Sequence, residues 1–379
     1  MDGSAKFRAR VLISTFVYDY TALAVAQALE HIGCDVQRWF MPDYPTRQAL
    51  SLSITPNRAL RIRARGAQID RNLDDFDVVW FRRFSVPYIN EDVLHPDDLA
   101  MTKTETKMFV DGFAPLIGAS ARQINPVYNA ERADNKLLQL TLAQKMGLTV
   151  PETLFSNDPA LIREFIYRHK ESGVVHKQFR SHSWEENGKR YGNYTATVTL
   201  EQLPPDVYLQ MVPGIFQPRI RKAKEIRAIF FGSCCVAAAI DHRPLDQGDD
   251  WRYQAKQDWH HFELPEHVAS LIRRFMKCLG IVFGSADLIL TPEGKYVFLE
   301  INEQGQFLWL EQSAPELPVL DTFCRFVVEG SGFENRARAF PSVSLLDQGI
   351  FSSKRLNALA RNDRELHVVD DRGGRVRMG

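Results

Sequence analysis

The sequence lacks the long apolar runs and the net charge that would place it in several large protein classes. No apolar run approaches the length that spans a bilayer, and residues 1–14 lack the apolar core of a signal peptide. The 47 basic and 47 acidic residues cancel, so no overall field attracts nucleic acid. We therefore expect a cytoplasmic protein with neither membrane nor nucleic acid as a partner, in which any anion site is local.

A zinc site is also not expected. The five cysteines are odd in number and have no ligand-like spacing, and the adjacent Cys234 and Cys235 are expected in a buried strand. Such a set favours a reducing compartment. We assign no metal to His242, His260 or His261, because a carboxylate set described below explains a metal better.

The apolar patterning predicts an α/β protein. Its 379 residues, 45% of them hydrophobic, are enough for roughly two or three domains. Helices are expected at 21–32, 90–117, 129–146, 159–170 and 267–279, and strands at 11–14, 36–40, 77–81, 174–177, 207–212, 226–240, 287–290 and 296–302. The opening β-α-β unit has no Gly-x-Gly-x-x-Gly loop, which argues against a dinucleotide-binding fold.

The hydrophobic pattern does not decide the role of two segments. Residues 180–195 are polar, with Gly188 and Gly192, and lie between two strands. This composition fits a flexible flap over a ligand and fits an exposed hairpin tip equally well. Beyond residue 330 the chain turns polar, and we assign no role to that tail.

The strongest candidate site is a strand-turn-strand pattern with three oxygen-bearing side chains. Asp287 opens the first strand, residues 291–295 have turn chemistry, and Glu300 and Asn302 end the second strand on one face. The opposite face is expected to hold Val297, Leu299 and Ile301. Two carboxylates and an amide oxygen suit Mg²⁺, which characteristically bridges protein carboxylates to substrate phosphates. The alternative is an acidic strand end that faces solvent.

Candidate phosphate ligands are Lys136, at the front of a helix, and Lys177, at the end of an apolar strand. A lone lysine is usually a solvated surface charge, but burial of Lys177 by its apolar neighbours would require an anionic partner. Residues 210–212 (Gln210, Met211 and Val212) end a predicted strand and could offer backbone groups to an adenine ring.

A basic run at 218–227 surrounds the single acid Glu225. Such a run is either a solvated edge or a binding site for a triphosphate or an acidic peptide. Arg227 is the best candidate in this run for a binding residue. Apolar residues follow it directly, so it should lie where the chain enters a core strand. Arg252, in the cluster formed with Asp250 and Trp251, could steady a transferring phosphoryl group.

Taken in order, these residues resemble the ATP-grasp superfamily of carboxylate–amine ligases over roughly residues 120–330. Within it, the sequence is similar to the peptide-modifying ligases of the microviridin type, also called graspetide synthetases. The segments that carry the similarity are 79–83, 135–140, 147–159, 250–252 and 298–309. One departure is Glu303-Gln304, where many relatives have a proline after the metal asparagine.

This resemblance implies an ATP-grasp fold in which ATP lies between two α+β subdomains. The implied divisions are a pre-ATP-grasp domain at 1–124, a central subdomain at 125–205, a C-terminal subdomain at 206–334 and an unassigned extension at 335–379. The implied roles are phosphate binding by Lys136 and Lys177, adenine contact by Gln210, Met211 and Val212, ribose contact by Glu225, and Mg²⁺ binding by Asp287, Glu300 and Asn302.

The resemblance also implies the reaction. ATP would phosphorylate an Asp or Glu side chain of a ribosomally made precursor peptide, and a Ser, Thr or Lys side chain would then close a macrocyclic ester or amide. Arg227 and Arg252 would neutralise charge, and the precursor's leader would dock on the central subdomain and order the flap. A homodimer is common among such proteins. The alternatives are a ligase for free amino acids or a protein terminus, and a non-catalytic ATP-binding module.

Overall fold

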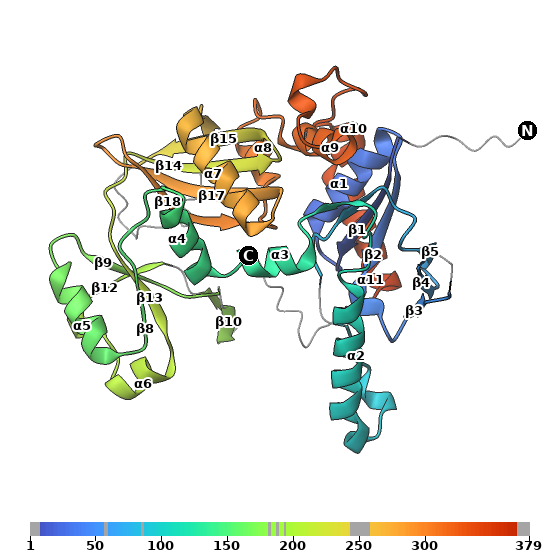
Figure 1. The fold of residues 1–379 in the computed structure, drawn as a ribbon, viewed down its shortest axis with the longest axis horizontal. Coiled ribbons are helices and arrows are strands. Elements are labelled where there is room, and N and C mark those ends of the chain that lie inside the picture. Colours follow the sequence, from blue (N-terminus) through green and yellow to red (C-terminus); the bar gives the residue numbers. More distant parts are fainter. Residues whose placement is uncertain are drawn as a thin grey trace, which may run out of the picture.

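A computed structural model describes residues 8–56, 60–84, 87–180, 183–186, 189–192, 195–242 and 258–369 (Figure 1). The predicted α/β class is confirmed, because sheets and helices alternate along the chain. No helix in these ranges is long and apolar enough to cross a membrane.

The N-terminal domain begins with the predicted β-α-β unit. Strands β1 (Arg10–Thr15), β2 (Asp35–Phe40), β6 (Val78–Trp80) and β7 (Arg122–Ile124) form a parallel sheet in the order β2-β1-β6-β7. Helix α1 (Tyr20–His31) starts where the Asp19 carboxylate accepts from the Ala22 amide, 3.0 Å away, and ends before Gly33 at φ 89°. A second, antiparallel sheet that the patterning missed consists of β3 (Gln48–Ser53), β4 (Arg61–Gly66) and β5 (Ile69–Asn72).

Two predicted helices are shorter than expected. The helix predicted at 90–117 is α2 (Leu99–Phe113), preceded by single turns at Glu91–Val93 and Pro96–Asp98, because Pro96 is incompatible with a helix interior. The helix predicted at 129–146 is divided into α3 (Val127–Ala133) and α4 (Lys136–Lys145). The division occurs at Asn135, whose side chain accepts from the Leu138 amide at 3.0 Å and caps α4.

The central lobe contains a four-stranded antiparallel sheet in the order β12-β9-β13-β8. Its elements are β8 (Leu154–Ser156), α5 (Pro159–Arg168), β9 (Val174–Lys177), β12 (Ala196–Val198), α6 (Asp206–Met211) and β13 (Gly214–Pro218). A separate hairpin, β10 (Ser183–Glu186) with β11 (Lys189–Gly192), lies in the segment where a flap or an exposed hairpin was predicted.

The strand predicted at 207–212 is wrong, because residues 207–211 belong to α6 and Val212 is the residue that ends it. The helix starts after Pro205, and Leu209 packs into the small core of the lobe beside Ile162, Phe165 and Phe216. The other apolar side chains of the segment are exposed, Met211 by 77% and Val212 by 67%. One buried residue per turn satisfies a helical period, and the strand that completes the sheet is β13 instead.

The C-terminal lobe contains a five-stranded antiparallel sheet in the order β16-β15-β14-β17-β18. Its strands are β14 (Lys224–Phe231), β15 (Cys234–Asp241), β16 (His260–His261), β17 (Phe283–Leu290) and β18 (Tyr296–Asn302), and α7 (Glu266–Leu279) covers one face. The hairpin predicted for β17 and β18 is confirmed. A bulge shifts the register between Asp287 and Leu288, so Phe298 and not Leu299 joins Ile301 in the core.

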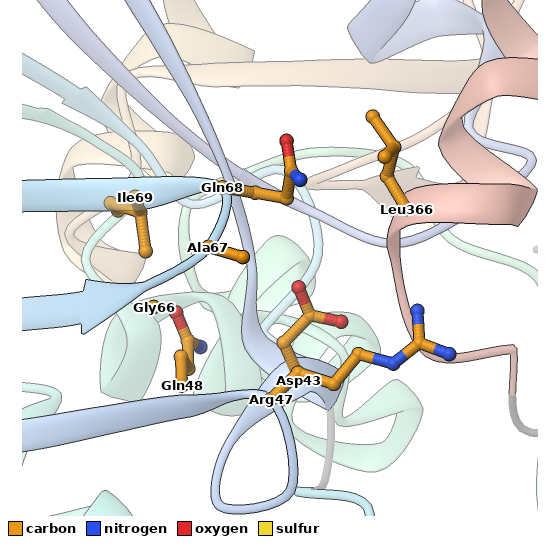
Figure 2. Close-up of a pocket in the computed structure, with 8 residues that line it drawn as sticks. All are labelled: Asp43, Arg47, Gln48, Gly66, Ala67, Gln68, Ile69 and Leu366. Carbon is orange, nitrogen blue, oxygen red and sulfur yellow. The ribbon is translucent and has the colours of Figure 1, made fainter.

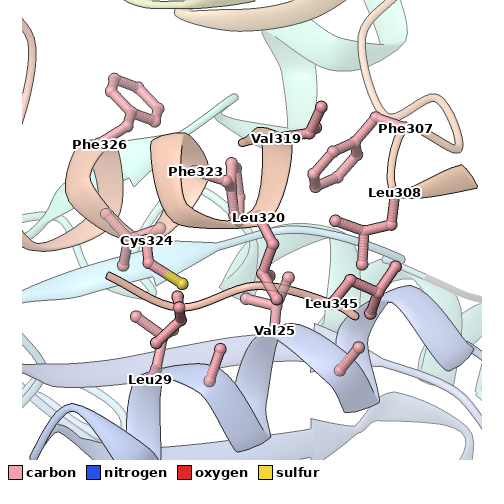
Figure 3. Packing of buried hydrophobic residues seen from close by; sticks show 14 of the residues in the cluster. Val25, Leu29, Phe307, Leu308, Val319, Leu320, Phe323, Cys324, Phe326 and Leu345 are labelled. Atoms are coloured by element: carbon pink, nitrogen blue, oxygen red, sulfur yellow. The ribbon is translucent and has the colours of Figure 1, made fainter. Parts of the chain in front are cut away.

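The chain then adds α8 (Trp309–Ser313), α9 (Val319–Glu329), α10 (Gln348–Phe351) and α11 (Ser353–Leu366). Helix α9 packs against α1, and Figure 3 shows Val25 and Leu29 of α1 facing Leu320, Phe323 and Cys324. The N-terminal domain and the C-terminal lobe therefore share one apolar core, whereas the central lobe has a small core of its own.

Candidate active site

One face of the C-terminal sheet is apolar at one end and charged at the other. Along β14, Ile229 and Phe231 enter the core that is shared with the N-terminal domain, and Glu225 and Arg227 occupy the same face further back. Direct pairing places Arg227 opposite Asp287, Asp287 opposite Glu300, and Ser285 opposite Asn302. The sheet register therefore brings the three predicted metal ligands and Arg227 together on three adjacent strands.

Arg227 is buried and ion-paired in this group. Its Nη1 donates to Oδ1 and Oδ2 of Asp287 at 2.6 and 2.8 Å, and its Nη2 donates to the carbonyl of Gln306 at 3.3 Å. Asn302 donates through Nδ2 to Asp287 Oδ2 at 3.3 Å, which leaves the amide oxygen of Asn302 as its ligating atom. The donor chemistry of Asp287, Glu300 and Asn302 therefore fits a hard cation such as Mg²⁺.

Lys136 approaches Glu300 from the first turn of α4. Its Nζ donates to Glu300 Oε2, and both side chains are about one-quarter exposed, at 26%. Burial lowers the pKa of Lys136, but the charges of Glu300, Asp134 and Asp287 raise it by more, so the net shift is upward. Lys136 therefore carries a stable positive charge beside a predicted metal ligand.

Lys177 reaches the same place from the other sheet. It ends β9, where it pairs with Ile215 of β13. Burial lowers the pKa of Lys177, and the nearby Glu300 and Asp287 oppose that shift, while Lys136 and Lys222 reinforce it. Lys136 from α4 and Lys177 from β9 thus lie within electrostatic range of the carboxylates of Glu300 and Asp287.

The connection between the two sheets supplies a further pair. Lys222 Nζ donates to Glu225 Oε1 at 3.0 Å, and both side chains are largely buried. The connection begins at Arg219, whose amide donates to the carbonyl of Gly173 at 2.9 Å. Glu225, the predicted ribose contact, therefore lies where the central lobe joins the charged face.

Two predicted elements of the site are not brought to it. Residues 210–212 form the end of α6, where the Gln210 carbonyl accepts from Asn157 Nδ2 at 2.8 Å, and Figure 1 places α6 at the far end of the central lobe. Their predicted role assumed a strand end, and that assumption is wrong. Arg252 and Asp250 lie outside the described residues.

The patterning missed Gln139, which holds β18, the strand of the predicted metal ligands Glu300 and Asn302, from outside. β18 is an edge strand, and the Gln139 side chain exchanges two hydrogen bonds with the backbone of Ile301, both 2.9 Å long. Gln139 is only 3% exposed and follows Lys136 by three positions, so both residues lie on one side of α4. The three-residue spacing between Lys136 and Gln139 was the sequence signal that could have identified Gln139 as part of the site.

A second unpredicted feature is Glu303, directly after Asn302. Burial raises the pKa of Glu303 to about 7, and Asp134 adds to the shift while Arg83 and Arg82 oppose it. The departure from a proline at this place therefore adds an ionisable group to the edge of the site.

A cavity lies away from the charged face. It measures ≈ 210 Å³ and lies in the N-terminal domain, between the β4–β5 turn and the end of α11 (Figure 2). Asp43 and Arg47 line it with Gln68 and Leu366. It contains none of the residues of the charged face.

Comparison with known proteins agrees with this architecture. Residues 10–131 match the family model described as the MvdD pre-ATP grasp domain. No curated protein matches the chain. The fold is similar to the macrocyclase MdnC from Microcystis aeruginosa MRC, solved with the precursor peptide MdnA, with 27% identity, a TM-score of 0.73, and coverage of 84% of this chain and 99% of that chain.

Two further solved structures show the same similarity. The macrocyclase MdnB from Microcystis aeruginosa MRC is 29% identical, with a TM-score of 0.69 over 84% of this chain and 99% of that chain. A RiPP-associated ATP-grasp ligase from Chryseobacterium gregarium, solved with ADP and a leader and core peptide, is 25% identical, with a TM-score of 0.76 over 88% and 99%. Residues 10–131 therefore match a pre-ATP-grasp domain and the chain has the fold of these ATP-grasp peptide ligases, which supports the microviridin-type resemblance of the sequence.

Proposed function

We propose that this protein uses ATP and Mg²⁺ to phosphorylate Asp or Glu side chains of a ribosomally made precursor peptide and then links them to Ser, Thr or Lys side chains as macrocyclic esters or amides. The observation that supports this most directly is the gathering of Lys136, Lys177 and Arg227 around Asp287 and Glu300. Cations around a carboxylate pair fit a magnesium-bound polyphosphate.

In this proposal Asp287, Glu300 and Asn302 hold Mg²⁺, which supplies charge neutralisation at the phosphates. Lys136 and Arg227 neutralise the two carboxylates in the structure as it stands. Lys177, whose burial disfavours its charge, gains most from a polyanionic partner, so we assign it to the phosphates.

The residues that connect the two sheets are proposed to bind the ribose and adenine of ATP. Glu225 retains its proposed contact with the ribose, since it lies on the charged face beside Lys222. Because Gln210 and Met211 belong to α6, we propose the backbone of 220–222 for the adenine edge instead. The amides of Arg219 and Ala223, on either side, already donate to the carbonyls of Gly173 and Leu290.

The chemistry requires activation because a carboxylate is a poor electrophile. A carboxylate oxygen attacks the γ-phosphorus of ATP, ADP leaves, and the acyl phosphate is then attacked by a hydroxyl or an amine with loss of phosphate. The peptide loses one water for each ring. Positioning and charge neutralisation supply most of the rate, and we propose Arg227 for the second of these, with Arg252 as a further candidate from the sequence.

The precursor's leader is proposed to dock on the central lobe and to order the β10–β11 hairpin. Helix α6 offers this lobe an exposed apolar surface in Val207, Tyr208 and Met211, which are 59%, 63% and 77% exposed. An acidic core segment would suit the cationic site. We further propose a cytoplasmic location and a homodimer.

Trapping with hydroxylamine tests this function. The protein is incubated with ATP, Mg²⁺, hydroxylamine and an acidic candidate precursor peptide. We expect ADP release that depends on the peptide and hydroxamates on Asp or Glu side chains. Hydroxamates formed only on added free amino acids would support a ligase for free amino acids, and absence of ADP release with every acceptor would support a non-catalytic module.

A further inference from the structure

The loop that follows Asn302, residues 303–306, is held by four side chains from the N-terminal domain. The contacts are Asn125 Nδ2 to Glu303 O (2.6 Å), Arg82 Nη1 to Gln304 O, Trp80 Nε1 to Gln304 Oε1 (3.3 Å) and Thr21 Oγ1 to Gln306 Oε1 (2.7 Å). Within the loop, the Gly305 amide makes a long turn bond of 3.4 Å to Asn302 O. The conformation next to the metal asparagine therefore depends on residues that are at least 178 positions away in the sequence.

Asn125 joins both strands of the metal hairpin at its open end. Its Oδ1 accepts from the amides of Val282 and Phe283 at 2.9 and 3.2 Å, and its Nδ2 donates to Phe283 O at 2.8 Å and to Glu303 O. The side chain is fully buried, and its backbone has φ 49°, a conformation that asparagine tolerates. Asn125 thus fixes the start of β17 relative to the end of β18.

Arg82 supports the next carbonyl of the loop. It is 0% exposed, its Nε lies 3.1 Å from Oδ2 of Asp19, and its guanidinium lies 5.8 Å from the Trp80 ring centre. Burial lowers the pKa of Arg82 to about 10, which leaves it charged at neutral pH. A buried cation is costly unless its N–H groups have acceptors. Arg82 therefore needs the Gln304 carbonyl as an acceptor, and this need restricts where the loop can lie.

Resting on the proposed function, we propose that Asn125 and Arg82 are positioning residues, which set the 303–306 loop and through it the metal ligand Asn302. Both lie within residues 10–131, which match the pre-ATP-grasp domain. Neither side chain contacts the predicted ligands Asp287 or Glu300 in a described hydrogen bond. Their effect on the metal is therefore indirect, through the backbone of β17, β18 and the loop.

Metal binding measures this effect without relying on turnover. Mn²⁺ is titrated into the protein with ADP present, and bound Mn²⁺ is followed by electron paramagnetic resonance. Asn125→Asp keeps the acceptor of Asn125 but removes its donor, and Arg82→Lys keeps charge but loses the planar fork. Each substitution is expected to weaken Mn²⁺ binding about tenfold, the scale seen when residues behind metal ligands are changed.

The matched control is Arg38→Met, which removes another partly buried arginine of the same domain, one that pairs with Asp363. It should lower the melting temperature and leave the Mn²⁺ affinity unchanged. Thr21→Val is a milder probe, because it removes only the bond to Gln306 and preserves side-chain shape. It should weaken Mn²⁺ binding by about twofold to fivefold, less than the loss of a ligand-supporting donor.

The outcomes are distinct. Weaker Mn²⁺ binding in Asn125→Asp, Arg82→Lys and Thr21→Val, with Arg38→Met unaffected, supports the proposal. Unchanged Mn²⁺ affinity in the Asn125→Asp or the Arg82→Lys protein, or a loss matched by Arg38→Met, overturns it. If the unsubstituted protein binds no Mn²⁺ with ADP, the proposed function fails instead.

Discussion

The side-chain amide of Gln139 in α4 replaces a missing strand neighbour for Ile301 at the edge of the C-terminal sheet. It donates to the carbonyl of Ile301 and accepts from its amide, both at 2.9 Å, so this residue is paired as if another strand lay beside it. Ile301 lies between Glu300 and Asn302, and the same helix supplies Lys136 to Glu300. Helix α4 therefore supports the predicted metal strand by both backbone and charge.

Gln139→Met tests this support. Methionine has a similar length but cannot replace these two bonds or the bond from Gln139 Nε2 to the Ala133 carbonyl at 2.6 Å, so three backbone groups lose a partner. We expect a loss of about 2–3 kcal/mol in the free energy of unfolding, measured by urea titration, with weaker Mg²⁺-dependent ADP binding. Gln144→Met, exposed on the same helix, is the control and should be near neutral. Equal effects of the two substitutions would contradict the role of Gln139.

Glu300→Gln tests the metal assignment. It keeps the size of the side chain and removes the charge that would face Mg²⁺ and that pairs with Lys136. We expect peptide-dependent ATP turnover to fall by about a hundredfold or more, the scale of losing a major electrostatic group. Glu293→Gln, in the exposed turn of the same hairpin, should retain activity. Full turnover by the Glu300→Gln protein would refute the assignment.

The alkaline limb of activity should depend on Lys177. Burial lowers the pKa of this cation, so in the free enzyme its charge is present below that pKa and lost as the pH rises through it. The value of kcat/KM for ATP should therefore decline before the pH reaches about 10.4, where an ordinary lysine loses its proton. Lys177→Arg should move the limb to higher pH. An unmoved limb, or the same shift in the exposed control Lys145→Arg, would contradict this role.

The C-terminal extension should contribute measurably to stability. Arg38 in β2 donates to both oxygens of Asp363 in α11 at 2.5 and 2.8 Å, and Asp363 is almost fully buried. Asp363→Ala leaves Arg38 without this partner, and we expect a loss of about 2–3 kcal/mol in unfolding free energy. Asp70→Ala breaks the exposed pair with Arg63 and should cost less than about 1 kcal/mol. Similar losses in urea titrations would argue against a structural role for the extension.

The sequence predicted the β17–β18 hairpin and the lysines because their signals are local. Apolar strands, a turn and a polar pair at positions 300 and 302 lie within one short segment. Lys177 was predicted because apolar neighbours precede it on its strand. Local alternation therefore located most of the charged face.

The features that the sequence-based predictions got wrong or missed have physical reasons. The segment 207–212 fits helix and strand periods almost equally, and packing of Leu209 against the lobe core decided for a helix. In the missed sheet, β4 alternates buried Ile62 and Ala64 with exposed arginines, so the strand pattern was present but rested on only two apolar residues, one of them small. The supports given by Arg82 and Asn125 join residues far apart in sequence, and no local pattern encodes such contacts.

The central claim is peptide cyclisation, and mass spectrometry of the product tests it most directly. The protein is incubated with ATP, Mg²⁺ and a candidate precursor peptide that carries acidic and Ser, Thr or Lys side chains, with the Glu300→Gln protein as the control. We predict that the peptide loses the mass of one water for each ring, with one ADP released per ring, and that fragmentation locates the links between acidic and Ser, Thr or Lys side chains. ATP consumption with an unchanged peptide mass would contradict the claim.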